Sequence, residues 1–123
     1  MKIRFLYVDD EPDIREIAEL ALSLDPEVEV RTCASGEEAL AIAPEWKPDL
    51  ILLDMMMPRL DGPATLNRLR ELPETRTTPI VFVTARAQNR EVQGLIDLGA
   101  DGVIAKPFDP MTFAATARAY LGR

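Results

Sequence analysis

The chain has 123 residues and a formal net charge of −7, from 14 Lys and Arg against 21 Asp and Glu. This length fits one domain with a single core, and the acidic balance argues against direct binding to nucleic acid. The chain contains no histidine and one cysteine, Cys33. These counts exclude catalytic triads built on histidine, imidazole metal ligands and an internal disulfide.

No apolar run approaches the roughly 20 residues that a membrane-spanning helix requires. Residues 1–4 lead directly into a strand pattern and not into the apolar segment of a signal peptide. We therefore expect a cytoplasmic protein with no membrane contact, organised as a single domain over residues 1–123.

Strand and helix patterns alternate from the beginning of the chain. Residues 3–8 predict a strand, and Pro12 suits the first turn of a helix that is expected to end near Asp25. Over residues 28–32 apolar and charged side chains alternate, which predicts a strand with one more exposed face.

A capping box opens the next helix, which leads to the most apolar strand. Ser35 is expected to cap this helix, with Glu38 three residues on, and the helix is expected to end before Pro44. Residues 49–53 then predict a strand buried on both faces, because an unbroken run of branched aliphatic side chains precedes Asp54.

Further strand and helix units complete the chain. Pro63 suits the first turn of a helix, and residues 80–83 and 103–105 predict strands. Asp109 is expected to cap the last helix, with Pro110 as its first residue. Regular alternation of this kind predicts an α/β fold with a doubly wound parallel sheet and helices on both faces.

Polar side chains stand where the predicted strands end. They are Asp9, Asp10, Asp54, Thr84 and Lys106, and a doubly wound fold gathers such strand ends on one rim. Carboxylates about 4 Å apart repel one another by about 4 kcal/mol per pair at an effective dielectric of about 20. One lysine offsets part of this repulsion, and a divalent cation would offset the rest. A site that has only oxygen ligands suits Mg²⁺.

Phosphoryl transfer onto Asp54 uses every member of this set. A carboxylate is a competent phosphoryl acceptor. The metal and Lys106 would neutralise charge on the phosphoryl oxygens, so that catalysis is mainly positioning and electrostatics. The protein is then not an enzyme acting on other molecules and catalyses only its own phosphorylation and dephosphorylation.

The segments that carry these residues together resemble a known family. They are Val8-Asp9-Asp10-Glu11-Pro12, Leu53-Asp54-Met55-Met56-Met57-Pro58, Asp61-Gly62, Thr84-Ala85 and Lys106-Pro107-Phe108. The chain is similar to the receiver domain of two-component response regulators, the family of the chemotaxis regulator CheY. This resemblance spans essentially the whole chain and implies a flavodoxin-like, five-stranded parallel sheet in the order 2-1-3-4-5.

The resemblance also implies roles for individual residues. Asp54 would be the phosphoacceptor and a metal ligand, Asp10 a direct Mg²⁺ ligand, and Asp9 a ligand acting largely through water. The backbone carbonyl of Met56 would complete the protein ligands.

Two further residues would act on the phosphoryl group. Thr84 would hydrogen-bond to it and Lys106 would pair with it, and the bond before Pro107 would be cis. The implied donor is a histidine kinase or a histidine phosphotransfer protein. The output partner is unknown, and the phosphorylated form would act by protein contact or in a phosphorelay, apparently as a stand-alone domain.

Three positions qualify the resemblance to this family. Val103 stands where receivers commonly carry Tyr or Phe, so the usual aromatic relay is not expected. Met56 and Arg86 occupy positions that influence hydrolysis of the phosphoaspartate in this family. Because a methionine cannot orient a water molecule by hydrogen bonds, we predict a phosphoform that lasts longer than that of fast chemotaxis receivers.

The same residues bear on three alternative functions. A phosphatase of the haloacid dehalogenase type also uses an Asp nucleophile and Mg²⁺, but it has a second Asp where this chain has Met56. A flavodoxin-like electron carrier needs a phosphate-binding loop where residues 9–12 would repel the flavin phosphate. A pseudo-receiver that is never phosphorylated remains a further alternative.

Overall fold

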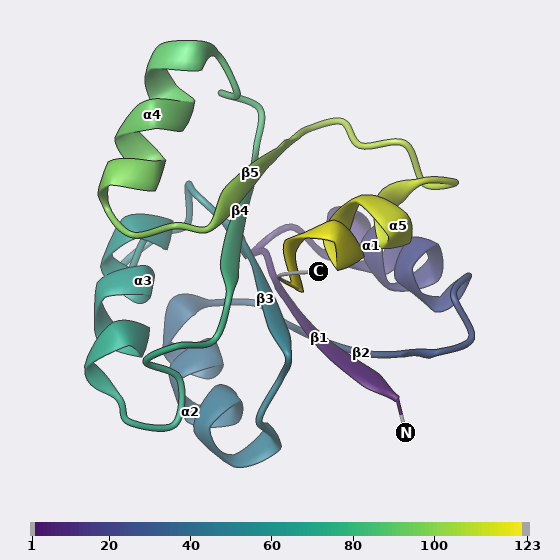
Figure 1. Ribbon diagram of the computed structural model, residues 1–123, viewed down its shortest axis with the longest axis horizontal. Coiled ribbons are helices and arrows are strands. Elements are labelled where there is room, and N and C mark those ends of the chain that lie inside the picture. Colours follow the sequence, from purple (N-terminus) through teal and green to yellow (C-terminus); the bar gives the residue numbers. More distant parts are fainter. Residues whose placement is uncertain (1, 122–123) are drawn as a thin grey trace.

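The computed structural model describes residues 2–121, which form a five-stranded parallel sheet covered by helices on both faces (Figure 1). The strands are β1 (Ile3–Val8), β2 (Val28–Cys33), β3 (Leu50–Asp54), β4 (Ile80–Thr84) and β5 (Gly102–Ala105). The helices are α1 (Pro12–Ser23), α2 (Gly36–Trp46), α3 (Gly62–Glu71), α4 (Asn89–Asp97), α5 (Phe113–Arg118) and the 3₁₀ turn η1 (Ala119–Leu121). Within residues 2–121, none of the helices combines the length and the apolar character needed to cross a membrane.

The strand order is β2-β1-β3-β4-β5, and each neighbouring pair is parallel. The predicted fold class and strand order are therefore confirmed. From β1 the chain first crosses to β2 at one edge and then returns to place β3 on the other side of β1. The carboxyl ends of β1 and β3 thus flank the point where the winding reverses, which is where sheets of this kind bind ligands.

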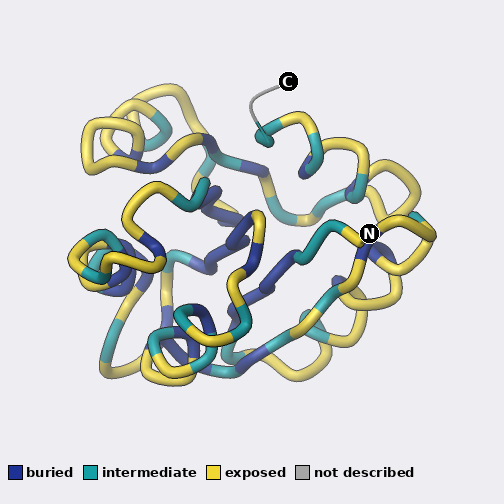
Figure 2. The backbone as a smooth tube through the Cα atoms, turned by 60° about the horizontal axis from the view of Figure 1, so that its bottom comes forward, coloured by how far each residue is buried: buried dark blue, intermediate teal, exposed yellow. Residues whose placement is uncertain are grey.

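The two faces of the sheet bury different side chains. One face, which includes Leu6, Leu53 and Phe82, packs against α2, α3 and α4, and the opposite face, which includes Tyr7 and Leu52, packs against α1 and α5. Figure 2 shows the buried backbone running through the central strands while the exposed backbone lies mainly on the outer helices. Burial on both faces explains why β3 and β4 consist of buried residues throughout.

Helix α2 confirms one prediction and corrects another. Its cap is Ser35, whose hydroxyl accepts a hydrogen bond from the Glu38 N–H at 3.1 Å. The helix does not end before Pro44 but continues through it to Trp46. The proline falls in the last turn, where its missing N–H removes only one helical hydrogen bond, and Lys47 then ends the helix in a left-handed conformation with φ of 56°.

The last helix begins later than the sequence predicts. Asp109 does not cap α5, which starts at Phe113. Instead the Asp109 carboxylate accepts a hydrogen bond from the Met111 N–H at 2.9 Å, and its carbonyl accepts one from the Thr112 N–H at 3.1 Å. Asp109 therefore closes a turn of its own, and Pro110 lies inside that turn.

Trp46 marks the end of the molecule that lies away from the strands' carboxyl ends. It is the last residue of α2, and the Arg4 guanidinium lies 5.5 Å from its ring centroid. Arg4 belongs to the amino-terminal part of β1 and also pairs with Glu29 at the beginning of β2.

Candidate functional site

Asp9 follows the last residue of β1 and is wholly buried. Its Oδ1 accepts a hydrogen bond from the Glu11 N–H at 3.1 Å. Its Oδ2 accepts two, from the Tyr7 hydroxyl at 3.0 Å and from Lys106 Nζ at 2.8 Å. A buried carboxylate requires such donors, since an unpaired charge away from water is strongly disfavoured.

Asp54 is the last residue of β3 and lies beside Asp9 across the sheet. Its Oδ1 accepts a hydrogen bond from Lys106 Nζ at 3.2 Å, so the lysine ammonium bridges the two carboxylates. Lys106 is held in place because its own N–H donates to the carbonyl of Thr84, the last residue of β4, at 2.8 Å. Three strands and the residue after β5 thus bring the predicted groups together.

The electrostatics of this cluster are dominated by excess negative charge. Burial and the neighbouring Asp9 raise the pKa of Asp54 to about 6, although Lys106 opposes the shift. Burial disfavours the charged form of Lys106, yet its hydrogen bond and attraction to Asp9, together with Asp54, raise the pKa of the lysine above its ordinary value. A single ammonium therefore does not fully balance the carboxylates.

The carboxylates of Asp9, Asp10 and Asp54 fit a hard divalent cation. Each offers an oxygen, and these oxygens lie within 4.8 Å of one another. Asp9 and Asp54 are buried whereas Asp10 is half-buried, so the group opens to solvent on the Asp10 side. Oxygen ligands of this kind match the preferences of Mg²⁺.

A cavity of about 210 Å³ adjoins Asp54 and provides room for a substrate group. Its lining includes Thr84 and Lys106, and also Met56 and Arg86. The Thr84 side chain is buried, and its Oγ1 accepts a hydrogen bond from the Arg86 N–H at 3.0 Å. The predicted residues Asp54, Thr84 and Lys106 therefore face one space.

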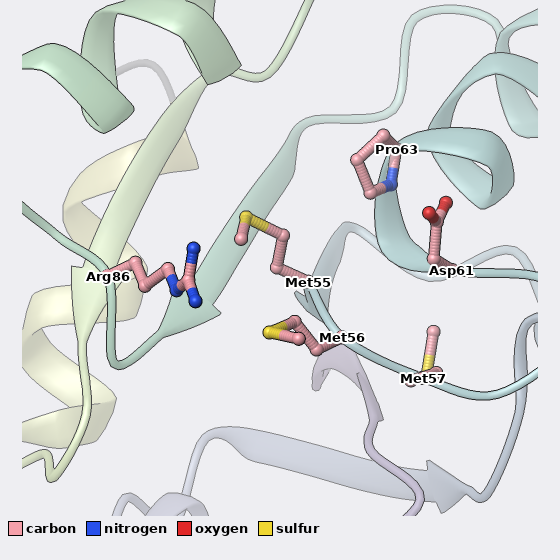
Figure 3. Close-up of a pocket in the computed structure, with 6 residues that line it drawn as sticks. All are labelled: Met55, Met56, Met57, Asp61, Pro63 and Arg86. Atoms are coloured by element: carbon pink, nitrogen blue, oxygen red, sulfur yellow. The ribbon is translucent and has the colours of Figure 1, made fainter.

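A second cavity of about 490 Å³ lies next to the first and shares Met56 and Arg86 with it. Figure 3 shows Met55 and Met56 on the side that faces Arg86, with Asp61 and Pro63 at the beginning of α3. The Met56 side chain is 63% exposed. The thioether of Met56 thus stands at the entrance of the cavity that adjoins Asp54.

Comparison with protein families decides which family the chain belongs to. A family model described as the response regulator receiver domain matches residues 5–118. The chain belongs to the response regulator receiver family. It is therefore a receiver domain of two-component systems.

Relatives and solved structures agree with this assignment. The probable transcriptional regulator ycf27 of Cyanophora paradoxa is 41% identical over 122 residues, which cover 99% of this chain and 49% of the relative. The phosphate regulon transcriptional regulatory protein PhoB of Pseudomonas aeruginosa is 39% identical over 119 residues, which cover 96% of this chain and 51% of the relative. The chain thus spans about half the length of the curated relatives it matches.

Among solved structures, the chemotaxis response regulator CheY4 of Vibrio cholerae superposes with a TM-score of 0.89 at 32% identity, covering 98% of this chain and 99% of that one. A response regulator from Desulfuromonas acetoxidans superposes with a TM-score of 0.86 at 28% identity, covering 97% and 96%. The receiver fold therefore extends over nearly the whole chain.

The region around β5 follows the expected receiver pattern at Pro107 and departs from it at Val103. Val103 is aliphatic and half-buried, and the Lys106–Pro107 bond is cis, as the resemblance implies. An aromatic ring reaches β5 from elsewhere, since Tyr120 of η1 donates a hydrogen bond to the Val103 carbonyl at 3.4 Å. This ring lies so close to Gly102 that a Cβ there would stand 2.0 Å from it.

The sequence reasoning missed Tyr7. The strand pattern over residues 3–8 gives it no polar role, whereas its hydroxyl donates to Asp9. A signal was available, because residues two apart on a strand share a face and a buried tyrosine hydroxyl needs a polar partner. Tyr7 stands two residues before Asp9, so its partner was within reach on that face.

Proposed function

We propose that this receiver domain accepts a phosphoryl group on Asp54 in a Mg²⁺-dependent reaction. The observation that carries the proposal is the bridge from Lys106 Nζ to Asp9 and Asp54 beside a cavity that Thr84 also lines. The chain has no histidine, so the phosphohistidine lies outside these residues, in a histidine kinase or a histidine phosphotransfer protein.

The transfer uses Asp54 as the nucleophile. A carboxylate oxygen of Asp54 forms a bond to phosphorus while the bond from phosphorus to the donor imidazole nitrogen breaks, and the electron pair stays on that nitrogen, which takes up a proton. The donor set of Asp9, Asp10, Asp54 and the Met56 carbonyl would hold Mg²⁺. When bound, the ion supplies positive charge that offsets the charge on the phosphoryl oxygens.

The remaining groups orient and neutralise the transferred phosphoryl group. Lys106 exchanges a carboxylate partner for a phosphoryl oxygen, which keeps its ammonium paired. Thr84 can donate its hydroxyl proton to another phosphoryl oxygen, because its Oγ1 already accepts from Arg86. We propose that the domain catalyses only this reaction and the hydrolysis that reverses it, and acts on no other substrate.

The output of the phosphoform is proposed to be a protein contact or a phosphorelay. The net charge of −7 favours protein partners over nucleic acid for this domain itself. Relatives about twice its length are named as transcriptional regulators, and one from Synechocystis is named a DNA-binding dual master transcriptional regulator. A receiver domain joined to a DNA-binding domain would regulate DNA binding indirectly.

Acetyl phosphate with Mg²⁺ tests the acceptor chemistry directly. We expect a phosphoryl mass adduct on the wild type that is absent from Asp54→Asn and absent when EDTA is added. Asp13→Asn makes the same charge change at an exposed position outside the site and should be labelled like the wild type. An adduct that persists on Asp54→Asn would refute the assignment of the acceptor.

The lifetime of the phosphoform is expected to depend on Met56. An amide at this position can orient a water molecule toward the phosphoaspartate, whereas the thioether cannot. We predict that Met56→Asn shortens the lifetime about tenfold, measured as decay of the mass adduct after removal of acetyl phosphate. Met111→Asn, at a methionine that is 79% exposed and outside the site, is the control. An unchanged or longer lifetime for Met56→Asn would contradict the prediction.

A further inference from the structure

Asp9 Oδ2 has two side-chain donors of very different mobility. Lys106 reaches it at 2.8 Å through a long, flexible side chain, and Tyr7 reaches it at 3.0 Å through a rigid ring. The same lysine also donates to Asp54. One donor is thus shared within the site and the other belongs to Asp9 alone.

The Tyr7 ring is fixed from several sides. The residue is wholly buried in β1, between its neighbours Thr32 of β2 and Leu52 of β3. Its ring meets Phe113 edge to face, with the centroids 6.2 Å apart and the planes at 83°. Because such packing restricts both χ angles of a tyrosine, it keeps the hydroxyl directed at Asp9.

Phe113 is held in turn by the chain that follows Lys106. Its ring stacks on Phe108 at a centroid distance of 3.9 Å and an interplanar angle of 12°. Phe108 follows the cis bond between Lys106 and Pro107. The ring that carries the Tyr7 hydroxyl and the segment that carries the Lys106 ammonium therefore belong to one packed unit.

The proposed function requires Lys106 to pair with a phosphoryl group on Asp54. Asp9 would then lose a donor while remaining wholly buried, and an unpaired buried carboxylate oxygen is unfavourable. The Tyr7 hydroxyl donates to the same oxygen and would leave it paired after Lys106 departs.

We propose that Tyr7 is a positioning residue whose hydroxyl keeps Asp9 in place and paired while Lys106 turns from Asp9 to the phosphoryl group. The inference rests on the proposed function and names a residue that assists it. Without the hydroxyl, Asp9 retains Lys106 more strongly, and the lysine is less available to the incoming group.

The first test concerns the shared oxygen and needs neither metal nor phosphate. We compare the wild type, Tyr7→Phe, Lys106→Met and the double variant by urea unfolding in metal-free buffer. Because either donor alone still pairs Oδ2, the double variant should lose more stability than the two single variants together. Additive losses would show that the two donors do not substitute for one another and would overturn the proposal.

The second test measures labelling by acetyl phosphate in the presence of Mg²⁺. Tyr7→Phe should keep a folded circular dichroism spectrum and lower the limiting labelling rate about tenfold, with the half-saturating acetyl phosphate concentration unchanged. Tyr120→Phe removes the hydroxyl of the other tyrosine and should label at the wild-type rate. A wild-type limiting rate for Tyr7→Phe would show that its hydroxyl is only structural.

The two tests separate this inference from the proposed function. If the wild type itself takes up no phosphoryl group from acetyl phosphate, the proposed function fails, and the inference that depends on it fails with it. If the wild type is labelled and Tyr7→Phe is labelled equally fast, only the role of Tyr7 is refuted.

Discussion

The protonation of Asp54 links the site to the stability of the domain. Burial and Asp9 raise the pKa of this carboxyl from its ordinary value of 3.8 to about 6. The folded protein therefore holds this proton more tightly than the unfolded chain does. The contribution of Asp54 to stability consequently falls as the pH rises from about 4 to about 6, and the loss is complete above that range.

The variant Asp54→Asn isolates this contribution because it cannot ionise. In metal-free buffer we expect it to be about 2 kcal/mol more stable than the wild type at about pH 8, and close to it below about pH 4. The measurement is urea unfolding of both proteins across this pH range. A difference that shrinks with rising pH would contradict the sign of the shift.

Most residues of the site could be predicted because each one is a polar residue at the carboxyl end of an apolar strand. Asp9, Asp54 and Thr84 follow or end such strands, and parallel strands place their carboxyl ends together. Tyr7 could not be recognised in the same way, since a tyrosine inside an apolar strand also suits a purely hydrophobic core. The direct bond between Asp9 and Lys106 joins residues 97 positions apart and follows only from the packed sheet.

At the scale of the elements, the beginning of α3 is packed tightly against the chain that leaves β3. A Cβ on Gly62 would lie 2.5 Å from the Asp54 carbonyl oxygen and 2.7 Å from Met55 Cα. These are backbone atoms that cannot move away without shifting the acceptor strand. The Gly62 N–H also donates to the Met55 carbonyl at 2.9 Å, which closes the loop.

We predict opposite effects for the same substitution at two glycines. Gly62→Ala should lower the free energy of unfolding by about 2–3 kcal/mol through overpacking. Gly94→Ala, in the middle of α4 with no atom within 4 Å of the added Cβ, should raise it by about 1 kcal/mol. Urea unfolding of both variants checks this, and equal effects at the two sites would show that space around the glycine is not decisive.

The type of each element could be predicted more reliably than its ends. The periodic spacing of apolar residues predicts the strands and helices correctly, whereas the positions of the prolines do not locate the ends of the helices. The sequence predicts that Pro44 ends α2, but this proline fits into the last turn of the helix. It also predicts that Pro110 opens α5, but this proline lies in the turn that Asp109 closes. Both errors arise because a proline fixes its own φ without fixing the hydrogen bonds of its neighbours.

At the scale of the whole molecule, negative charge is concentrated where a cation is expected. The chain carries a net charge of −7, and three of its carboxylates meet at the rim of the sheet. A ligand that binds only the folded state stabilises that state according to its concentration relative to its Kd. Mg²⁺ should therefore act on the stability of the entire domain.

We predict that Mg²⁺ stabilises the wild type by about 2.7 kcal/mol at a free concentration about a hundred times its Kd. The measurement is urea unfolding with Mg²⁺ against a sodium salt of equal ionic strength. Asp10→Asn should abolish most of the gain, whereas Asp13→Asn, which makes the same charge change at an exposed position, should retain it. Equal stabilisation of both variants by Mg²⁺ would indicate general screening of the negative charge and not binding at a specific site.

The position of Trp46 has a practical consequence for the unfolding measurements. It is the only tryptophan of the chain, and it packs beneath Arg4 at the end of the sheet opposite the acidic cluster. Its fluorescence therefore changes when α2 separates from β1 as the protein unfolds, while the charge on Asp54 is remote from the indole. The chain thus carries an intrinsic optical probe of unfolding at the end of the sheet opposite its own site.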